Sequence, residues 1–492
     1  MSTLDYRRSS VALMRACVMP GVLAAALTGC ASLSSDGDAA ALAALVVPRA
    51  AGISSADAAL AMDAAPASRE HALRELLAKH PLSADDAVLI ALLNHPALQA
   101  SLAQLRISDA QRVQAATLPN PHLTIGRLRD PASVQADLSI GINVLGVLTL
   151  PWRSESANRQ HEMARLQAAQ DIVRVAAEAR KAWFRAVAAS QSRQYAEQAH
   201  EAADAAAELA RRMARAGNFS KYQQAREQSV RAETLAQLTR ARQLETSERE
   251  QLLRRLGLAD AALPLALPAQ LPPLPAALPA LTDIEARALR ERLDVQASLL
   301  QARQTARQIG YTRVTGYANA LDLKLIGTRT DDLISGGRER ARGAELELPV
   351  PLFDWGRAAT AGAQARYALA TAQVQQTAVQ ARSEVREAWQ GWRHAWDLAR
   401  HYRDELVPLR RQITDETLLR YNGMIVGVFD LLAETRLTIA AVNASVDAWR
   451  DFWLIDTDLQ TALSGTSPGT VATLRAGASA AAGAATHNTT GH

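Results

Sequence analysis

One stretch of the chain alternates apolar and polar positions without interruption, from Val134 to Val144. Apolar side chains occupy every second position, and the positions between them carry polar side chains or glycine. This period of two predicts a β-strand with two chemically different faces. A shorter alternating segment upstream, with Leu123 and Ile125, predicts an antiparallel partner across the sequence RLRDPAS. Together the two segments predict a β-hairpin at about 121–150.

Most of the remaining chain has a helical pattern. Residues 154–216 contain no proline and no glycine, which corresponds to roughly 95 Å of unbroken helix. Small and β-branched residues recur there at steps of three and four, the spacing of a coiled-coil seam between closely packed helices. An ordinary helical bundle would show a similar seam but would not explain the hairpin. The seam and its counterpart in a later segment are Ile172, Val175, Ala179, Ala182, Ala186 and Ala189, and Ala378, Ala381, Val385, Ala388, Trp392 and Ala395.

The chain contains an internal repeat. LQASLAQLRISDAQ from Leu98 matches VQASLLQARQTARQ from Val295, and EARKAW from Glu178 matches EVREAW from Glu384. The distance between matching residues grows from 197 to 206 positions between these two pairs. The chain is therefore a tandem duplication whose second copy carries a short insertion between the two matches.

A second hairpin is predicted in the interval that holds this insertion. Residues 321–325 and 344–350 alternate apolar with charged positions, and a polar, glycine-bearing segment at 327–343 separates them. We expect a hairpin at about 311–352, with 327–343 as an exposed loop.

Four strands of this kind suggest a membrane sheet that needs further copies of the chain. Beyond the N-terminal segment no apolar run has the length of a membrane helix, so a spanning segment would have to be β. A membrane strand needs about 9–11 residues, and an open edge would leave backbone groups unpaired in lipid. Because known membrane barrels begin at eight strands, a homo-oligomer with cyclic symmetry is implied.

The N-terminus has the features of a secretory signal. Arginines precede an apolar run at 16–27 that is too short to span a bilayer as a helix. The run ends in LTGC, which resembles the lipobox of bacterial lipoproteins and implies lipidation of Cys30. In such lipoproteins a residue other than aspartate after the cysteine, here Ala31, goes with sorting to the outer membrane. Cys17 lies inside the signal, so no disulfide is expected.

Two glycines, Gly217 and Gly423, interrupt the long helices at equivalent places in the repeat. Glycine accepts the positive φ that often ends a helix, so a helical-hairpin turn is predicted at each position. A tolerated kink within a continuous helix is the alternative.

Composition and motifs exclude several functional classes. The 54 basic and 50 acidic residues give a net charge of only +4 without a concentrated basic stripe, so nucleic acid is not an expected partner. HEMAR at His161 has Arg165 where a zinc protease needs its second histidine, and GASAA at Gly477 lacks the last glycine of a nucleophile elbow. We expect no enzyme, no cofactor and no metal. His394 and His401 are expected to be solvent-exposed side chains.

The residues resemble those of the TolC-like outer-membrane efflux proteins over about 82–465. The resemblance rests on LSADDAVLIALLNHPALQAS at Leu82, PVPLFDWGR at Pro349 and LLRYNGMIVGVFDLLAETRL at Leu418. It implies a mainly α fold with a membrane β-barrel. In that fold a homotrimer builds an α-barrel tunnel from long helical hairpins and a twelve-stranded barrel from four strands per chain. It also implies docking on a periplasmic membrane-fusion adaptor and an inner-membrane pump, commonly of the resistance-nodulation-division class.

The same resemblance assigns site residues. It places the two helical tips at the periplasmic entrance, where they meet the adaptor, and it places rings of acidic side chains just after the second tip. Asp430 and Glu434 are the candidates for this constriction, although Leu432 and Tyr222 depart from the pattern of the family. Two solvated helix charges are the alternative. The tip residues are Gly217, Asn218, Phe219, Ser220, Gly423, Met424, Ile425 and Val426.

These observations give a domain plan and a function. We expect an outer-membrane channel that conducts drugs, metal ions or other small molecules out of the cell, located in the outer membrane with a periplasmic helical tunnel. A periplasmic coiled-coil adaptor or structural lipoprotein without a channel is the alternative. The plan comprises a lipoprotein signal peptide (1–29), a lipidated tether (30–80), the first repeat (81–257), a proline-rich linker (258–280), the second repeat (281–465) and a disordered tail (466–492).

Overall fold

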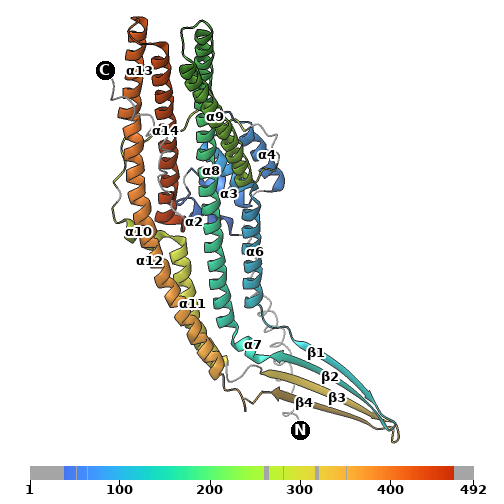
Figure 1. Ribbon diagram of the computed structural model, residues 1–492. Helices are drawn as coiled ribbons and strands as arrows, with labels where there is room; N and C mark the ends of the chain where they lie inside the picture. Colours follow the sequence, from blue (N-terminus) through green and yellow to red (C-terminus); the bar gives the residue numbers. More distant parts are fainter. Residues whose placement is uncertain are drawn as a thin grey trace. The chain divides into compact units, whose positions relative to one another are not determined.

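The computed structural model describes residues 38–50, 52–63, 65–259, 265–280, 282–315, 321–350, 352–469 and 472. The elements form two compact units, and each unit contains segments of both repeats (Figure 1). We call them the β unit, with residues 38, 103–165 and 299–373, and the helical unit, with residues 39–102, 166–298 and 374–472. Cys30 and most of the C-terminal tail lie outside the described residues.

The β unit contains one sheet whose four strands are antiparallel and follow the order of the chain (Figure 1). Both predicted hairpins are confirmed, and they lie side by side because β2 of the first pairs with β3 of the second. One line of paired residues across the sheet runs Leu123, Ile140, Leu325 and Ala344. The strands are β1 (His122–Arg129), β2 (Ser133–Asn143), β3 (Asp322–Asp332) and β4 (Arg338–Glu347).

The boundaries of the second hairpin differ from the prediction. Of the segment 327–343 that was expected as a loop, only 333–337 lies between the strands, and the rest belongs to β3 and β4. Thr328 pairs with Ala341 in the ladder, and the pairing continues to Asp331 and Arg338. The polar composition is that of a loop, but β4 is exposed on both faces, so its positions have no requirement for apolar side chains.

The first hairpin is shorter at its end than predicted. Residues 144–148 form the short helix α7 (Val144–Leu148), and the long helix α8 (Leu150–Arg215) follows. The side chain of Asn143 accepts a hydrogen bond from the backbone N–H of Gly146. This N-cap ends the strand and starts the helix.

Long helices connect the two units. The uninterrupted helix predicted from 154 to 216 is confirmed by α8, which has 66 residues. Each repeat begins with a helix that leads to its hairpin and continues with a longer helix that leads away from it. The other three of these helices are α6 (Pro96–Ala116), α11 (Leu293–Thr315) and α12 (Arg357–His401).

The core of the helical unit follows the predicted seams. All residues of the first seam and all of the second except Ala378 are buried. The second seam packs on Phe452 and Ile455, which are 1% and 0% exposed. The unit includes α9 (Lys221–Leu256), α10 (Ile284–Glu291), η1 (Tyr402–Leu406), α13 (Val407–Asn422), α14 (Val428–Gln460) and η2 (Thr461–Gly465).

Two charged groups lie in this unit, one buried and one half-buried. Arg292 is 1% exposed, and its guanidinium donates to Glu384 Oε2 at 2.9 Å and to Asp294 Oδ2 at 2.6 Å. Asp456 accepts a hydrogen bond from the indole N–H of Trp392 at 2.8 Å. Burial raises the pKa of the Asp456 carboxyl above its ordinary value.

The segment expected as an N-terminal tether is folded from residue 38 onward. It forms three helices, and the guanidinium of Arg49 donates to the backbone carbonyls of Glu291 at 3.2 Å and Ser464 at 2.9 Å. Leu42 and Val46 are fully buried. The tether is therefore part of the helical unit, through α2 (Ala39–Val46), α3 (Ser55–Asp63) and α4 (Pro66–Leu77), which lead to α5 (Ala84–Asn94).

The described part of the proline-rich linker has no helix or strand and packs on the same core. The indole N–H groups of Trp396 and Trp453 donate to the carbonyls of Pro275 at 3.1 Å and Pro272 at 3.2 Å. Leu271 is 4% exposed. A segment without its own hydrogen-bond ladder is thus held by aromatic side chains of α12 and α14.

Within the described part of the chain, no single helix has both the length and the apolar composition needed to cross a membrane. The helices α5 and α6 meet the criteria only as a bent pair.

Candidate functional site

One face of the sheet is apolar and exposed. We call it the apolar face. In the half of the sheet nearest the helices, each strand contributes leucine or isoleucine side chains to this face. Leu123 is 63% exposed, Ile140 is 50%, Leu325 is 58% and Leu346 is 63%. A sheet in water buries such a face against a second layer. Here the described residues provide no covering layer, because none of these side chains is buried.

The opposite, polar face is the less exposed one along β2. Gln135, Asp137 and Ser139 are half-buried, whereas Ala136 and Leu138 between them are exposed. On the same polar face the ammonium of Lys324 pairs with Glu347 at 2.7 Å. This arrangement, with half-buried polar side chains and exposed apolar side chains, is the inverse of a water-soluble sheet and matches a membrane β-strand.

Both outer edges of the sheet lack a partner strand among the described residues. The strand order is β1-β2-β3-β4, so β1 and β4 each present one unpaired edge. Unpaired backbone groups are costly in lipid, so both edges need strands from other chains in a membrane.

The first helical tip has the predicted turn. Gly217 has φ +81, and no atom lies within 4 Å of the position that a Cβ would occupy. The N–H of Asn218 donates to the carbonyl of Met213 at 2.9 Å, and the N–H of Gly217 donates to that of Ala214 at 3.1 Å. A left-handed residue with these bonds is the usual C-terminal end of a helix.

At the second tip the predicted role of Gly423 is wrong. Gly423 has φ −79, and the left-handed position is taken by Met424 with φ 57. The N–H of Ile425 donates to the carbonyl of Arg420 at 2.8 Å, as Asn218 does at the first tip. Met424 is therefore the structural counterpart of Gly217. The glycine match placed the turn one residue early, because a shared residue type was taken for a shared backbone conformation.

The residues after each turn start the returning helix in the same way. The side chain of Gln223 accepts the N–H of Ser220 at 3.0 Å, and the carboxylate of Asp430 accepts the N–H of Gly427 at 3.1 Å. Phe219 and Phe429 stack with ring centroids 4.8 Å apart. The two tips of one chain are thus held together by an aromatic pair that the sequence did not reveal.

The outer surface of the second tip is strongly apolar. Met424 is 94% exposed and Ile425 is 75% exposed. A single exposed apolar side chain is ordinary, but adjoining ones form a patch, and an exposed apolar patch is typical of an interaction site. Val426 lies beside them and is half-buried.

The two acidic candidates differ in environment. Asp430 is exposed and caps its own helix, as described above. Glu434 lies 3.8 Å from the guanidinium of Arg410, which offsets part of its charge. Nearby, Arg436 and Glu227 approach to 3.6 Å, so α9 and α14 also make a charged contact below the tips.

The β unit contains one group with the geometry of a metal site, among the residues that the structure describes. Ligand atoms of Asp38, Asp109 and His161 all lie within 4.8 Å of one another. The imidazole of His161 contacts Asp38 at 2.5 Å and the hydroxyl of Ser108 at 2.8 Å, and Asp109 pairs with Arg112 at 2.6 Å. Each ligand atom already has a protein partner, so the group is complete without an ion.

Both histidines that are expected to be exposed are exposed. His394 is exposed on α12, and His401 Nδ1 lies 3.2 Å from Glu405. Neither belongs to a group with metal-site geometry in the described ranges.

Comparisons with known proteins find the fold but no close relative. No protein-family model and no curated protein matches the chain. A membrane protein from Pseudomonas aeruginosa is similar in structure, with a TM-score of 0.65 and 20% identity over 80% of this chain and 93% of that one.

Two further solved structures share the fold. The outer membrane protein VceC from Vibrio cholerae has a TM-score of 0.60 and 18% identity over 78% of this chain and 96% of that one. The CmeC outer membrane channel of Campylobacter jejuni has a TM-score of 0.60 and 16% identity over 82% of this chain and 87% of that one. The chain therefore has the fold of the TolC-like outer-membrane efflux proteins, as its sequence resemblance implies.

Proposed function

We propose that this protein is the outer-membrane channel of a tripartite efflux pump. The observation that carries the proposal is the sheet, whose apolar face is exposed and whose polar face is half-buried along β2. Such a sheet is suited to lipid on one side and water on the other. The structural neighbours named as outer-membrane channels support the same location for this chain.

A trimer would give both edge strands of the sheet a hydrogen-bonding partner. With four strands per chain, three chains supply twelve strands, an even number within the range of closed membrane barrels. Each β1 edge would pair with the β4 edge of the next chain, and closure removes both unpaired edges. The long helices continue from the barrel as a periplasmic tunnel. Acyl chains on Cys30 would add an outer-membrane anchor.

The helical tips are the docking surface for the periplasmic adaptor. Exposed Met424 and Ile425 offer apolar contact, and the Phe219–Phe429 stack fixes one tip against the other. The inner-membrane pump supplies the energy, and this chain supplies a water-filled path for drugs, metal ions or other small molecules. No residue of the chain carries out a chemical reaction in this role.

Of the two acidic candidates, Asp430 is the better constriction residue. Its carboxylate is exposed, whereas Arg410 offsets the charge of Glu434. Three copies of Asp430 would form a negative ring that favours cations. Asp430→Asn should lower cation selectivity in planar bilayers, and Glu434→Gln should change it less.

Purified protein reconstituted in planar bilayers tests the main proposal. A channel gives discrete trimer conductances and migrates differently on a gel before and after heating. A periplasmic adaptor or structural lipoprotein would give neither, and it would remain in solution without detergent once the lipid anchor was removed by Cys30→Ala. That outcome would overturn the channel assignment.

A further inference from the structure

Arginines gather on the apolar face at the end of the sheet that is distant from the helices. Leu123, Ile125, Arg127 and Arg129 occupy alternate positions of β1, so all four lie on the same face. The strand pairing extends this set across the sheet. Six arginines share the face near the two hairpin turns: Arg127, Arg129, Arg329, Arg338, Arg340 and Arg342.

The register places these arginines in rows. Arg127 pairs with Ala136, which pairs with Arg329, which pairs with Arg340. Four residues along β1 separate this row from the wholly apolar row that begins at Leu123, or about 13 Å at the usual rise per residue. The lipid-facing apolar band of a membrane barrel is about 25 Å tall. A band centred on the apolar row would therefore end close to the row of Arg127, Arg329 and Arg340, and Arg342, which pairs with Gly327, lies one row further inside the band.

Most of this positive charge has no counterpart within the described residues. Asp331 lies on the same face and pairs with Arg329 and Arg338, at 3.2 Å in each case. Among the residues that the structure describes, no ion pair involves Arg127, Arg129, Arg340 or Arg342. The carboxylates of Asp130 and Asp332 are used instead by the turns, where they accept hydrogen bonds from Ser133 and Ser335.

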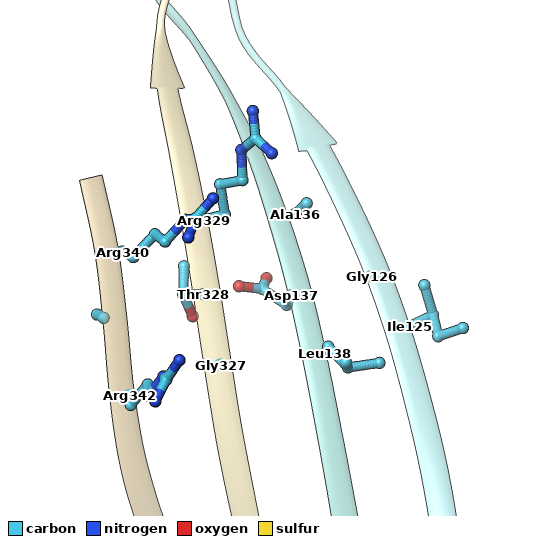
Figure 2. A pocket seen from close by; sticks show the side chains of 11 residues that line it. Ile125, Gly126, Ala136, Asp137, Leu138, Gly327, Thr328, Arg329, Arg340 and Arg342 are labelled. Atoms are coloured by element: carbon cyan, nitrogen blue, oxygen red, sulfur yellow. The ribbon is translucent and has the colours of Figure 1, made fainter. Parts of the chain in front are cut away.

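A pocket at the boundary combines the two chemistries. It has a volume of 320 Å³, and Figure 2 shows its lining side chains from close by. Ile125 and Leu138 line it from β1 and β2, and Arg329, Arg340 and Arg342 line it from β3 and β4. Asp137 also belongs to the lining, so three arginines face one carboxylate. Apolar surface next to guanidinium groups suits an amphiphile that has an acyl chain and an anionic head.

We propose that these arginines bind phosphate-bearing lipid headgroups in the leaflet that surrounds the hairpin turns. The inference rests on the proposed function, because the apolar face must meet lipid and the turns must point away from the periplasm. Guanidinium groups bind phosphate oxygens in pairs, and they are more weakly hydrated than ammonium groups. The pocket holds Ile125 and Leu138 together with Arg340 and Arg342, so a molecule that fills it needs an apolar part and an anionic part, which favours a lipid over a free anion.

Binding of defined lipids to the detergent-solubilised full chain tests this proposal. The probes are dioleoyl phosphatidic acid and dioleoylglycerol, which share acyl chains and differ in the phosphate. The test variant is the double substitution Arg340→Gln and Arg342→Gln. The matched control is Arg226→Gln with Arg240→Gln, which removes two exposed arginines from α9.

We expect the wild-type protein to prefer phosphatidic acid over dioleoylglycerol. The test variant should bind phosphatidic acid about 30-fold more weakly, because it removes two arginines and each contributes the usual attraction of one arginine for an anionic lipid surface. The control should change less than twofold, and salt should weaken the wild-type preference. Equal binding of both lipids, or unchanged binding by the test variant, would overturn the proposal.

Two further measurements separate the possible failures. If 10 mM inorganic phosphate displaces phosphatidic acid completely, the arginines form a free-anion site and the lipid assignment is wrong. Conductance of the same samples in planar bilayers reports on the proposed function independently. Wild-type conductance together with unchanged lipid binding by the test variant would refute the arginine site alone, whereas absence of wild-type conductance would refute the channel.

Discussion

Neighbouring residues of β2 provide a direct test of which face of the sheet meets lipid. Ile140 lies on the apolar face in the row that also contains Leu123 and Leu325, and Ser139 lies on the opposite face. Ile140→Arg places a charge at the centre of the apolar row. Ser139→Arg places the same side chain one residue away, in the water-filled interior of the proposed barrel.

The expected magnitudes differ clearly. An arginine at the lipid-facing midplane costs about 2–4 kcal/mol, and the proposed trimer would carry three copies, or roughly 6–12 kcal/mol. That range is comparable with the whole stability of an ordinary domain, about 5–15 kcal/mol. Ile140→Arg should therefore abolish most of the assembled barrel. Ser139→Arg should cost less than about 1 kcal/mol, because its guanidinium remains in water.

The assay is folding into lipid vesicles from urea, followed by heat-modifiable migration on a gel. We expect little folded trimer for Ile140→Arg and nearly the wild-type amount for Ser139→Arg. Helical content by circular dichroism controls for a general folding defect. Equal losses for the two variants, or a larger loss for Ser139→Arg, would show that the faces have been assigned incorrectly.

Three further predictions concern the helical unit, and thermal unfolding followed by circular dichroism measures each. Arg292→Met should destabilise the unit by about 3–5 kcal/mol, because it leaves the Glu384 carboxylate buried without its partner; a change below 1 kcal/mol would mean that the pair is accessible to water. Burial raises the pKa of the Asp456 carboxyl, so the folded state binds the proton of this carboxyl more tightly than the unfolded chain does. The resulting stabilisation is present below pH 4, and it is lost as the pH rises through the pKa of the folded state. Asp456→Asn should thus raise the melting temperature at pH 7 but not at pH 4, and an equal effect at both would contradict the assignment. Gly217→Ala should destabilise the first tip by about 1 kcal/mol, and Met424→Gly should stabilise the second by about 0.5–1 kcal/mol, because glycine is unstrained at a positive φ. Effects of the opposite sign would mean that Gly423, and not Met424, is the left-handed residue of the second turn.

The sequence predicted those elements whose hydrophobic period is regular. The alternation from Val134 to Val144 located β2 to within one residue, and the absence of proline and glycine after Ser154 predicted α8. These signals are local, because side-chain direction follows directly from the period. The full lengths of β3 and β4 were missed because polar residues in an uncovered sheet have the composition of a loop.

Features that depend on tertiary contacts could not be predicted. The left-handed conformation of Met424 follows from the hydrogen bonds of the turn and not from its residue type. The stack of Phe219 on Phe429 joins different repeats. The contact between His161 and Asp38 joins residues 123 positions apart, so no spacing rule could have found it.

The inverted sheet also has a consequence for the order of biogenesis. The helical unit has its own buried core, so in the proposed channel we expect it to fold in the aqueous periplasm before the sheet enters lipid. The strands have no such core, because their leucine and isoleucine side chains gain nothing until hydrocarbon surrounds them. We therefore expect newly exported chains to mature from the helices toward the hairpins, with the strands held by chaperones until insertion completes the molecule.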